Sequence, residues 1–177
     1  MFLDTATVAA LATWAVAFGT IAVLWWQTYI ARKLNSANAV MDLRERFDAP
    51  RMRKARKLLA ERLLAGRHDD ITNLEVAAFF ELIGALAHRR VLDREMVWEA
   101  FGTWTTGYYH ALRHPVDVIG RARTDLKDPL IMHEFEWLYS VTRNIDHRLV
   151  PSARMSEEQE HEEGLVLLRR EADLDTN

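Results

Sequence analysis

Two ionisable residues stand in the most apolar part of the chain, and they are the first candidates for chemistry. Glu81 lies in the run from Leu74 to Arg89, and His88 follows seven residues later, on the same face of a helix. A carboxylate among apolar side chains must be ion-paired, protonated or at the edge of the core. Arginines of later segments are candidate partners, so the expected buried polar cluster comprises Glu81, His88, Arg121, Arg123 and Glu136.

This cluster has two interpretations. In one, Glu81 is an acid or base with a shifted pKa in a cleft, as a membrane-tethered enzyme would need. That interpretation requires Glu81, His88 and a histidine from position 110, 114 or 133 to converge in one pocket. In the other, which we favour, the cluster is a structural set of ion pairs that fixes how the helices pack. No catalytic residue is assigned.

Histidine spacing makes a metal site a further candidate, but the ligand set is incomplete. His110 and His114 are four residues apart, so they share one face of a helix, as two ligands of one ion must. A third ligand would have to come from another segment, from His88, His133 or Glu134. The E-x-x-H sequence at 158–161 is only half of a di-iron pair. With no phosphate-binding glycine loop, dinucleotide fingerprint or nucleophile elbow, we assign no metal and no cofactor.

Cations crowd into the region around residues 32–67, although the whole chain carries a formal net charge of −3. Near an anionic lipid surface each cation contributes about 1 kcal/mol, so this region is expected to lie against lipid. The residues assigned to that contact are Arg32, Lys33, Arg44, Arg46, Arg51, Arg53, Lys54, Arg56 and Lys57. Two alternatives stay open: a membrane-bound regulator that binds nucleic acid, which we rank below lipid contact, and pairing with the acidic stretch near 157–163.

The N-terminal segment explains why lipid is expected nearby. No charged residue occurs between Asp4 and Arg32, and roughly 20 apolar residues at ~1.5 Å each give about 30 Å of helix, which matches a bilayer core. Trp25, Trp26 and Tyr29 stand at one end, where aromatic rings favour the headgroup level. A cleaved signal peptide would need basic residues before its apolar run, and none is there. A buried core helix is the other alternative.

Charge also predicts the orientation of this segment. Arg32 and Lys33 follow it and no cation precedes it, so the positive-inside rule places the N-terminus outside and the rest of the chain in the cytoplasm, at the inner membrane. The absence of cysteine fits that side. Small residues recur along one stripe and would let two such helices approach closely, which predicts a homo-oligomer; they are Ala12, Ala15, Gly19 and Ala22.

The remaining sequence predicts helices and no strands. Helical segments are expected at 51–65, 74–89, 94–113, 115–119 and 129–149, with a break at Pro50 and a start signal at Asp128–Pro129. The segment at 74–89 is apolar nearly all round and is therefore expected to be the central helix. Residues from 151 on are acidic, and we expect them to be disordered or to hold one short helix around Leu165 to Arg170.

Five short sequences in the middle of the chain carry a resemblance. They are "FFELIGAL" (79–86), "RRVLDREMVWEAFG" (89–102), "YYHAL" (108–112), "IGRAR" (119–123) and "DPLIMHEFEWL" (128–138). In these the chain resembles an uncharacterised family of small bacterial proteins with one N-terminal membrane span and a helical domain. The resemblance implies a bacterial source and membrane anchorage, and nothing catalytic. It departs at Arg90, where the family pattern often has glycine.

These observations predict an all-α protein in which an N-terminal transmembrane helix precedes a small cytoplasmic helical bundle. The expected parts are a membrane anchor at 1–33, a helical stalk at 34–49, the bundle at 50–150 and an acidic tail at 151–177. The expected function is a single-pass, membrane-anchored module for interaction or sensing, without assigned catalysis. Its partners are the lipid bilayer and a second copy of the chain, and the sequence identifies no protein partner.

Overall fold

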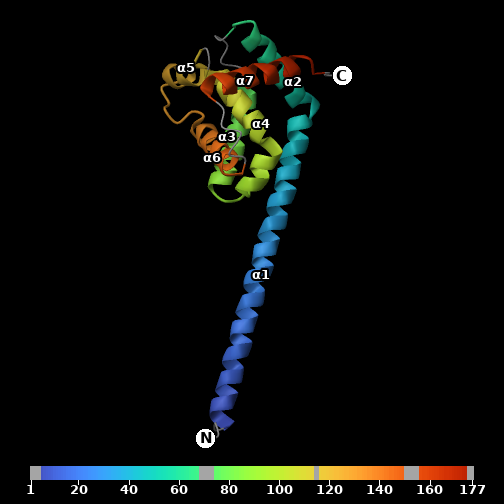
Figure 1. Ribbon diagram of the computed structural model, residues 1–177, viewed down its shortest axis with the longest axis vertical. Helices are drawn as coiled ribbons and strands as arrows, with labels where there is room; N and C mark the ends of the chain where they lie inside the picture. The colour runs from blue at the N-terminus through green and yellow to red at the C-terminus, as the bar shows by residue number, and fades with distance from the viewer. Residues whose placement is uncertain (1–4, 68–73, 114–115, 150–155, 175–177) are drawn as a thin grey trace.

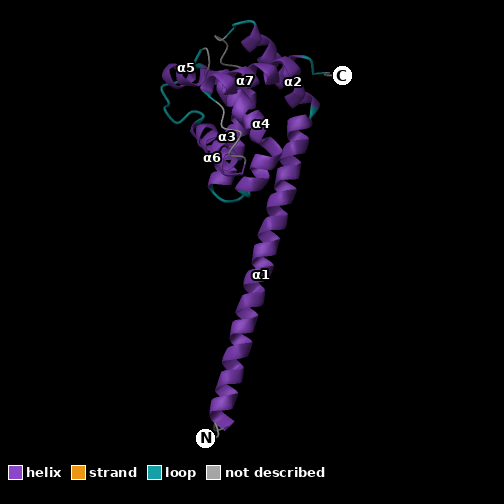
Figure 2. Cartoon of the chain, in the orientation of Figure 1, coloured by secondary structure: helices purple, strands orange, loops and turns teal. Residues whose placement is uncertain are grey.

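The computed structural model describes residues 5–67, 74–113, 116–149 and 156–174, and within them every regular element is a helix (Figure 2). The side chains of residues 5–13, 15 and 157 are outside that description. The elements are α1 (Thr5–Asp48), α2 (Pro50–Leu64), α3 (Glu75–His88), α4 (Arg94–Arg113), α5 (Val118–Asp125), α6 (His133–Leu149) and α7 (Glu157–Ala172). The all-α prediction is confirmed.

Helix α1 is one continuous helix whose two ends have different surroundings. Its C-terminal part packs against α2 and α4, whereas its N-terminal part projects away from the bundle (Figure 1). It ends at Asp48 because Pro50 is the first residue of α2, which confirms the predicted break. Among the residues with described side chains, no helix is both long and apolar enough to cross a membrane. Part of the predicted span, residues 6–13 and 15, lies outside that set.

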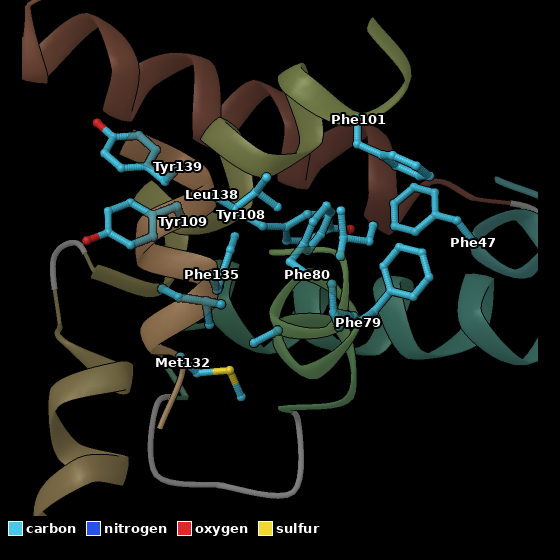
Figure 3. Close-up of a cluster of buried hydrophobic side chains, with 14 of the residues drawn as sticks. Phe47, Phe79, Phe80, Phe101, Tyr108, Tyr109, Met132, Phe135, Leu138 and Tyr139 are labelled. Atoms are coloured by element: carbon cyan, nitrogen blue, oxygen red, sulfur yellow. The ribbon is translucent and has the colours of Figure 1, made fainter. Parts of the chain in front are cut away.

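Phe47 brings the end of α1 into the core. It is fully buried, and its ring meets Phe79 in a stacked contact at 5.3 Å and Phe101 edge-on at 5.8 Å (Figure 3). Leu43 and Val40 are also buried, one and two turns earlier on the same face. The predicted stalk at 34–49 is therefore an integral part of the bundle.

Helix α4, and not α3, is the centre of the bundle. It packs against α1, α3, α5, α6 and α7, whereas α3 packs mainly against α6. Two glycines of α4, Gly102 and Gly107, are buried, and a Cβ at Gly107 would lie 2.4 Å from the Leu167 side chain of α7. Glycine adds little to the apolar character of a helix in the sequence, so these residues did not mark α4 as central. Because glycine has no side chain, however, neighbouring helices can approach α4 closely.

Helix α7 overturns the expectation of a disordered or short-helical tail. Its first turn is capped by Ser156 and Gln159, which exchange side-chain and backbone hydrogen bonds in a capping box. The helix packs along α2 and α4, and Leu168 is buried. The bundle therefore runs from about Ser36 in α1 to α7, beyond both boundaries expected for it.

Three helices end in the same way, and only one of them ends with glycine. After α2 the residue in the left-handed region is Gly66 (φ 68°), after α3 it is Arg90 (φ 59°), and after α5 it is Lys127 (φ 53°). At α3 the amides of Arg90 and Val91 bond back to the carbonyls of Ala87 and Leu86, which is a Schellman motif. Arg90 thus occupies a position that favours glycine, where the resemblance departs from its family pattern.

Replacing Arg90 by glycine should raise the free energy of unfolding by about 1 kcal/mol, because glycine avoids the steric cost of a side chain at positive φ. Urea unfolding of the full chain in detergent measures this change. The matched control is Arg89→Gly, one residue earlier at φ −77°, where glycine should instead lower stability by about 0.5–1 kcal/mol. Equal effects of the two replacements would contradict the prediction.

Candidate functional site

Glu81 and His88 both serve the contact between α3 and α6. A carboxylate oxygen of Glu81 accepts the backbone N–H of Phe135 at 2.7 Å, so Glu81 caps the first turn of α6 from a neighbouring helix. His88 lies 2.9 Å from Glu134 through Nδ1, and its ring stacks on Trp137 with centroids 4.3 Å apart. His88 is exposed, and Glu81 is only partly buried.

Arg123 and Glu136 form a separate set of contacts on the far side of α6. Arg123 bonds to Glu136 at 2.8 Å and to the carbonyl of Ile131, and the Tyr109 hydroxyl donates to Glu136 at 3.2 Å. The hydrogen bond from Arg123 holds the pKa of Glu136 below its ordinary value. Arg121 is an exposed residue of α5. The structure thus divides four of the five predicted residues between two sites.

The convergence that the enzyme interpretation requires is not found among the described residues. His88 pairs with Glu134 at the α3–α6 contact, whereas His110 is buried beside Tyr139 and Glu160. His133 is exposed, and His114 is outside the described residues. No group of three acidic or histidine side chains in the described part of the chain could hold a metal ion.

The basic region has more intramolecular partners than the expected lipid contact assumes. Arg44 bonds to Asp48 and to the carbonyl of Ala100, and its guanidinium lies over the Trp104 ring at 4.3 Å. Lys57 donates to the carbonyl of Leu174 beyond α7. The exposed Arg51 pairs with Glu75. Pairing of the basic region with the C-terminal segment, one of the alternatives considered, therefore occurs through Leu174, beyond the stretch at 157–163 that was expected.

Arg56 is inside the bundle, although it was expected at a lipid surface. Only 4% of its surface is exposed, and it forms a two-pronged pair with Glu171 of α7 at 2.7 and 3.2 Å. The same guanidinium donates to the carbonyl of Phe47 and lies 4.0 Å from the centre of the Phe47 ring. Trp104 adds an indole N–H to Glu171 at 3.3 Å. The pair therefore joins α1, α2, α4 and α7.

Replacing Glu171 by leucine should lower the free energy of unfolding by about 3–5 kcal/mol, because the buried Arg56 would lose its two-pronged partner and keep only the half-exposed Asp48 carboxylate, at 3.6 Å. The double replacement Arg56→Met with Glu171→Leu should recover most of that loss. Arg51→Met is the control, since it breaks an exposed pair worth less than about 1 kcal/mol. A double variant as unstable as the summed single variants would show that the two charges are not coupled.

A second buried carboxylate, Glu160, lies near the other end of α7. One of its oxygens is 2.7 Å from His110 Nε2 and accepts the Tyr139 hydroxyl at 3.1 Å. Its other oxygen is 3.1 Å from Arg143 Nε. Tyr139 also stacks on Tyr109, with ring centroids 4.1 Å apart (Figure 3). Helix α7 is thus attached to α4 and α6 by a polar cluster of Glu160, His110, Tyr139 and Arg143.

Burial and neighbouring carboxylates raise the pKa of Tyr108, Tyr109 and Tyr139. The folded chain therefore binds the hydroxyl protons of these tyrosines more tightly than the unfolded chain does. The protonated tyrosines contribute fully to the stability of the fold below the unfolded pKa near 10, and this contribution is lost as the pH rises above that value. Stability should fall by about 1.4 kcal/mol per pH unit for each tyrosine. Absorbance at 295 nm in a Tyr29→Phe background, followed with circular dichroism, measures this. Ionisation of all three near pH 10 in an intact fold would contradict it.

A cleft of about 950 Å³ lies between α6 and α7, over the face of α4 to which both helices pack. The floor includes Gly102, Thr106 and Gly107. Arg143, Asp146 and His147 line it from α6, and Glu160, Glu163, Val166, Leu167 and Arg170 line it from α7. Trp98 forms an end wall and donates its indole N–H to Asp146 at 2.6 Å.

Sequence reasoning missed both the cleft and the carboxylates of α7. Glu160 and Glu171 are three turns apart, and Leu168 lies near them on one face, so a helical pattern was present. The many acidic residues around this pattern instead favoured the interpretation of residues 151–177 as an acidic tail. The cleft forms because α6 and α7 both pack on α4 and leave a space between them. The spacing of residues along the chain does not predict such a space.

Comparisons with known proteins identify a family for this chain. A family described as "Domain of unknown function (DUF4760)" matches residues 3–141, from the start of the chain into α6. Helix α7 lies beyond the matched residues. No curated protein and no solved structure matches the chain. The expectation of an uncharacterised family is confirmed, and the chain belongs to the DUF4760 family.

Proposed function

We propose that this protein is a helical interaction module that α1 holds at a lipid bilayer. The observation that carries the proposal is the apolar surface of α1 between Trp14 and Leu34. Large hydrophobic side chains are exposed there on every side of the helix; they are Trp14, Val16, Phe18, Ile21, Val23, Leu24, Trp25, Trp26, Tyr29, Ile30 and Leu34. A helix that is apolar all round needs an apolar environment, and the bundle does not cover this part.

The proposal includes residues 6–13, which extend the uncharged sequence toward the N-terminus. The cations at the other end support a direction: Arg32 and Lys33 follow the apolar segment, so the bundle is proposed to lie on the cytoplasmic side of a bacterial inner membrane. Arg32 and Lys33, which adjoin the apolar segment, remain the proposed contacts with lipid headgroups, whereas α2 and its cations lie at the end of the bundle away from that segment (Figure 1).

The attachment of α1 to the bundle supports a fixed presentation of the bundle at that surface. Lys33 pairs with Asp93 at 3.1 Å, and the buried Ser36 hydroxyl accepts the backbone N–H of Asp93 at 2.6 Å. Val40 and Leu43 then continue into the core. Because α1 has no break between these contacts and its apolar part, the bundle and the proposed anchor move as one body.

Self-association through α1 is part of the proposal. Gly19 lies on the stripe of small residues, and a Cβ at this position would meet nothing within 4 Å. Ala22 is exposed on the same face, and the side chains of Ala12 and Ala15 are not described. A close helix–helix contact in lipid would use this face.

Flotation with lipid vesicles tests the anchor. Purified full-length chain, reconstituted with phosphatidylglycerol and phosphatidylethanolamine vesicles, should float and should resist extraction with alkaline carbonate. Ile21→Arg should shift the chain toward the unbound fraction, because an arginine at the centre of a membrane helix costs roughly 2.5–3.5 kcal/mol. Thermal unfolding of the bundle should be unchanged.

The control is Leu130→Arg, which places the same charge on an exposed residue of the bundle, outside the regular helices. It should float like the unmodified chain. A full-length chain that stays in the supernatant, or equal flotation of the Ile21→Arg variant, would refute the anchor. Because the chain has no cysteine, a single Ser140→Cys replacement on α6 shows on which side of the membrane the bundle lies. If the bundle is cytoplasmic, a membrane-impermeant maleimide should label this cysteine only after cell lysis.

A further inference from the structure

We propose that the cleft between α6 and α7 binds a small organic monocarboxylate with an apolar body, held by Arg143. The proposal does not depend on the membrane anchor, since α4, α6 and α7 build the site. Its volume of about 950 Å³ lies within the roughly 300–1,000 Å³ range of small-molecule sites.

Arg143 has the features of an anion anchor. Its Nε lies 3.1 Å from Glu160, whose side chain is 4% exposed and is itself held by His110 and Tyr139. The guanidinium is therefore oriented by a buried group, while 35% of the Arg143 side chain stays exposed in the cleft. The Nη1 and Nη2 groups carry the remaining N–H donors of the guanidinium. A carboxylate can accept both of these N–H groups in a two-pronged pair.

The other charges of the lining narrow the ligand class. One oxygen of Asp146 accepts the Trp98 indole N–H, and both oxygens of Glu160 face their buried partners. Arg170 adds a second cation on the α7 side. Acidic side chains nevertheless outnumber basic ones around the cleft, because Glu99 and Glu163 also line it. These carboxylates would repel a doubly charged phosphate ester more strongly than a singly charged carboxylate, so we assign the carboxylate as the anion.

The apolar side chains that line the cleft indicate what kind of body the carboxylate ligand has. Trp98 is fixed as a wall by its bond to Asp146, and Val166 and Leu167 face the cleft from the opposite helix. Gly102 puts no side chain into the floor, whereas the space above Gly107 is taken by the Leu167 side chain. An aromatic or branched aliphatic body would be covered by these groups, with its carboxylate on Arg143.

Saturation-transfer NMR on the full chain in nanodiscs tests the proposal, with empty nanodiscs as background. The probes are 3-phenylpropionate, 4-phenylbutyrate and 4-methylpentanoate, each beside its matched primary amine and alcohol. At least one carboxylate should bind, and its amine and alcohol should bind at least tenfold more weakly. Failure of all three carboxylates, or equal binding of the matched amines, would overturn the proposal.

Two variants locate the binding. Arg143→Gln should weaken the carboxylate at least tenfold, and Val166→Trp should do the same by filling the cleft without touching Glu160. The Val166→Trp result stays informative even if Arg143→Gln destabilises the bundle. Arg169→Gln, an exposed cation of α7 outside the cleft lining, should leave binding unchanged. Binding that survives Val166→Trp, or that Arg169→Gln weakens equally, would overturn the assignment to this cleft.

Discussion

The pair between Arg56 and Glu171 is the constraint on which the arrangement of the bundle depends. Its guanidinium reaches the Phe47 carbonyl at the end of α1, and its carboxylate partner comes from near the end of α7. A buried ion pair is favourable only when its geometry is good and its remaining hydrogen-bonding groups are satisfied. The Phe47 carbonyl and the Trp104 indole meet that requirement here, so one pair joins segments more than a hundred residues apart.

The second buried carboxylate, Glu160, fixes the position of α7 along the bundle. Glu160 joins α7 to His110 and Arg143, while Glu171 joins it to α2. Two buried polar attachments at opposite ends fix the helix along its length, and Gly107 sets its distance from α4. The space between α6 and α7 follows from this position. The same residues therefore stabilise the bundle and shape its cleft.

Much of the helical layout could be predicted from local sequence, because caps and breaks act locally. Pro50, Asp93 and the end of α4 at Arg113 were placed in this way. The start signal at Asp128–Pro129 failed, since Asp128 caps a turn and α6 begins only at His133. The partner of Glu81 was also missed: it is a backbone amide at the start of α6 and not an arginine. Which helix end lies beside a given side chain depends on tertiary packing.

The prediction of a central α3 shows a different limit. Apolar content suggested that α3 is covered on all sides, but Leu82 is exposed, and α4 with its threonines and glycines is the helix that five others cover. Small residues lower the apolar score of a segment while they allow close packing around it. The candidate site could not be predicted from the sequence either. Its anchor, Arg143 of α6, pairs with Glu160 of α7 only in the folded chain.

One consequence follows from the position of α7 outside the residues that the family matches. Arg56 and His110 belong to the matched part, yet both have their buried carboxylate partners on α7. In a family member without an equivalent helix, both groups would lose these carboxylates, and the surfaces of α2 and α4 that α7 covers would be open to solvent. Natural variation at positions 56 and 110 should therefore follow the presence of a C-terminal helix, because the carboxylate partners of both residues come from it.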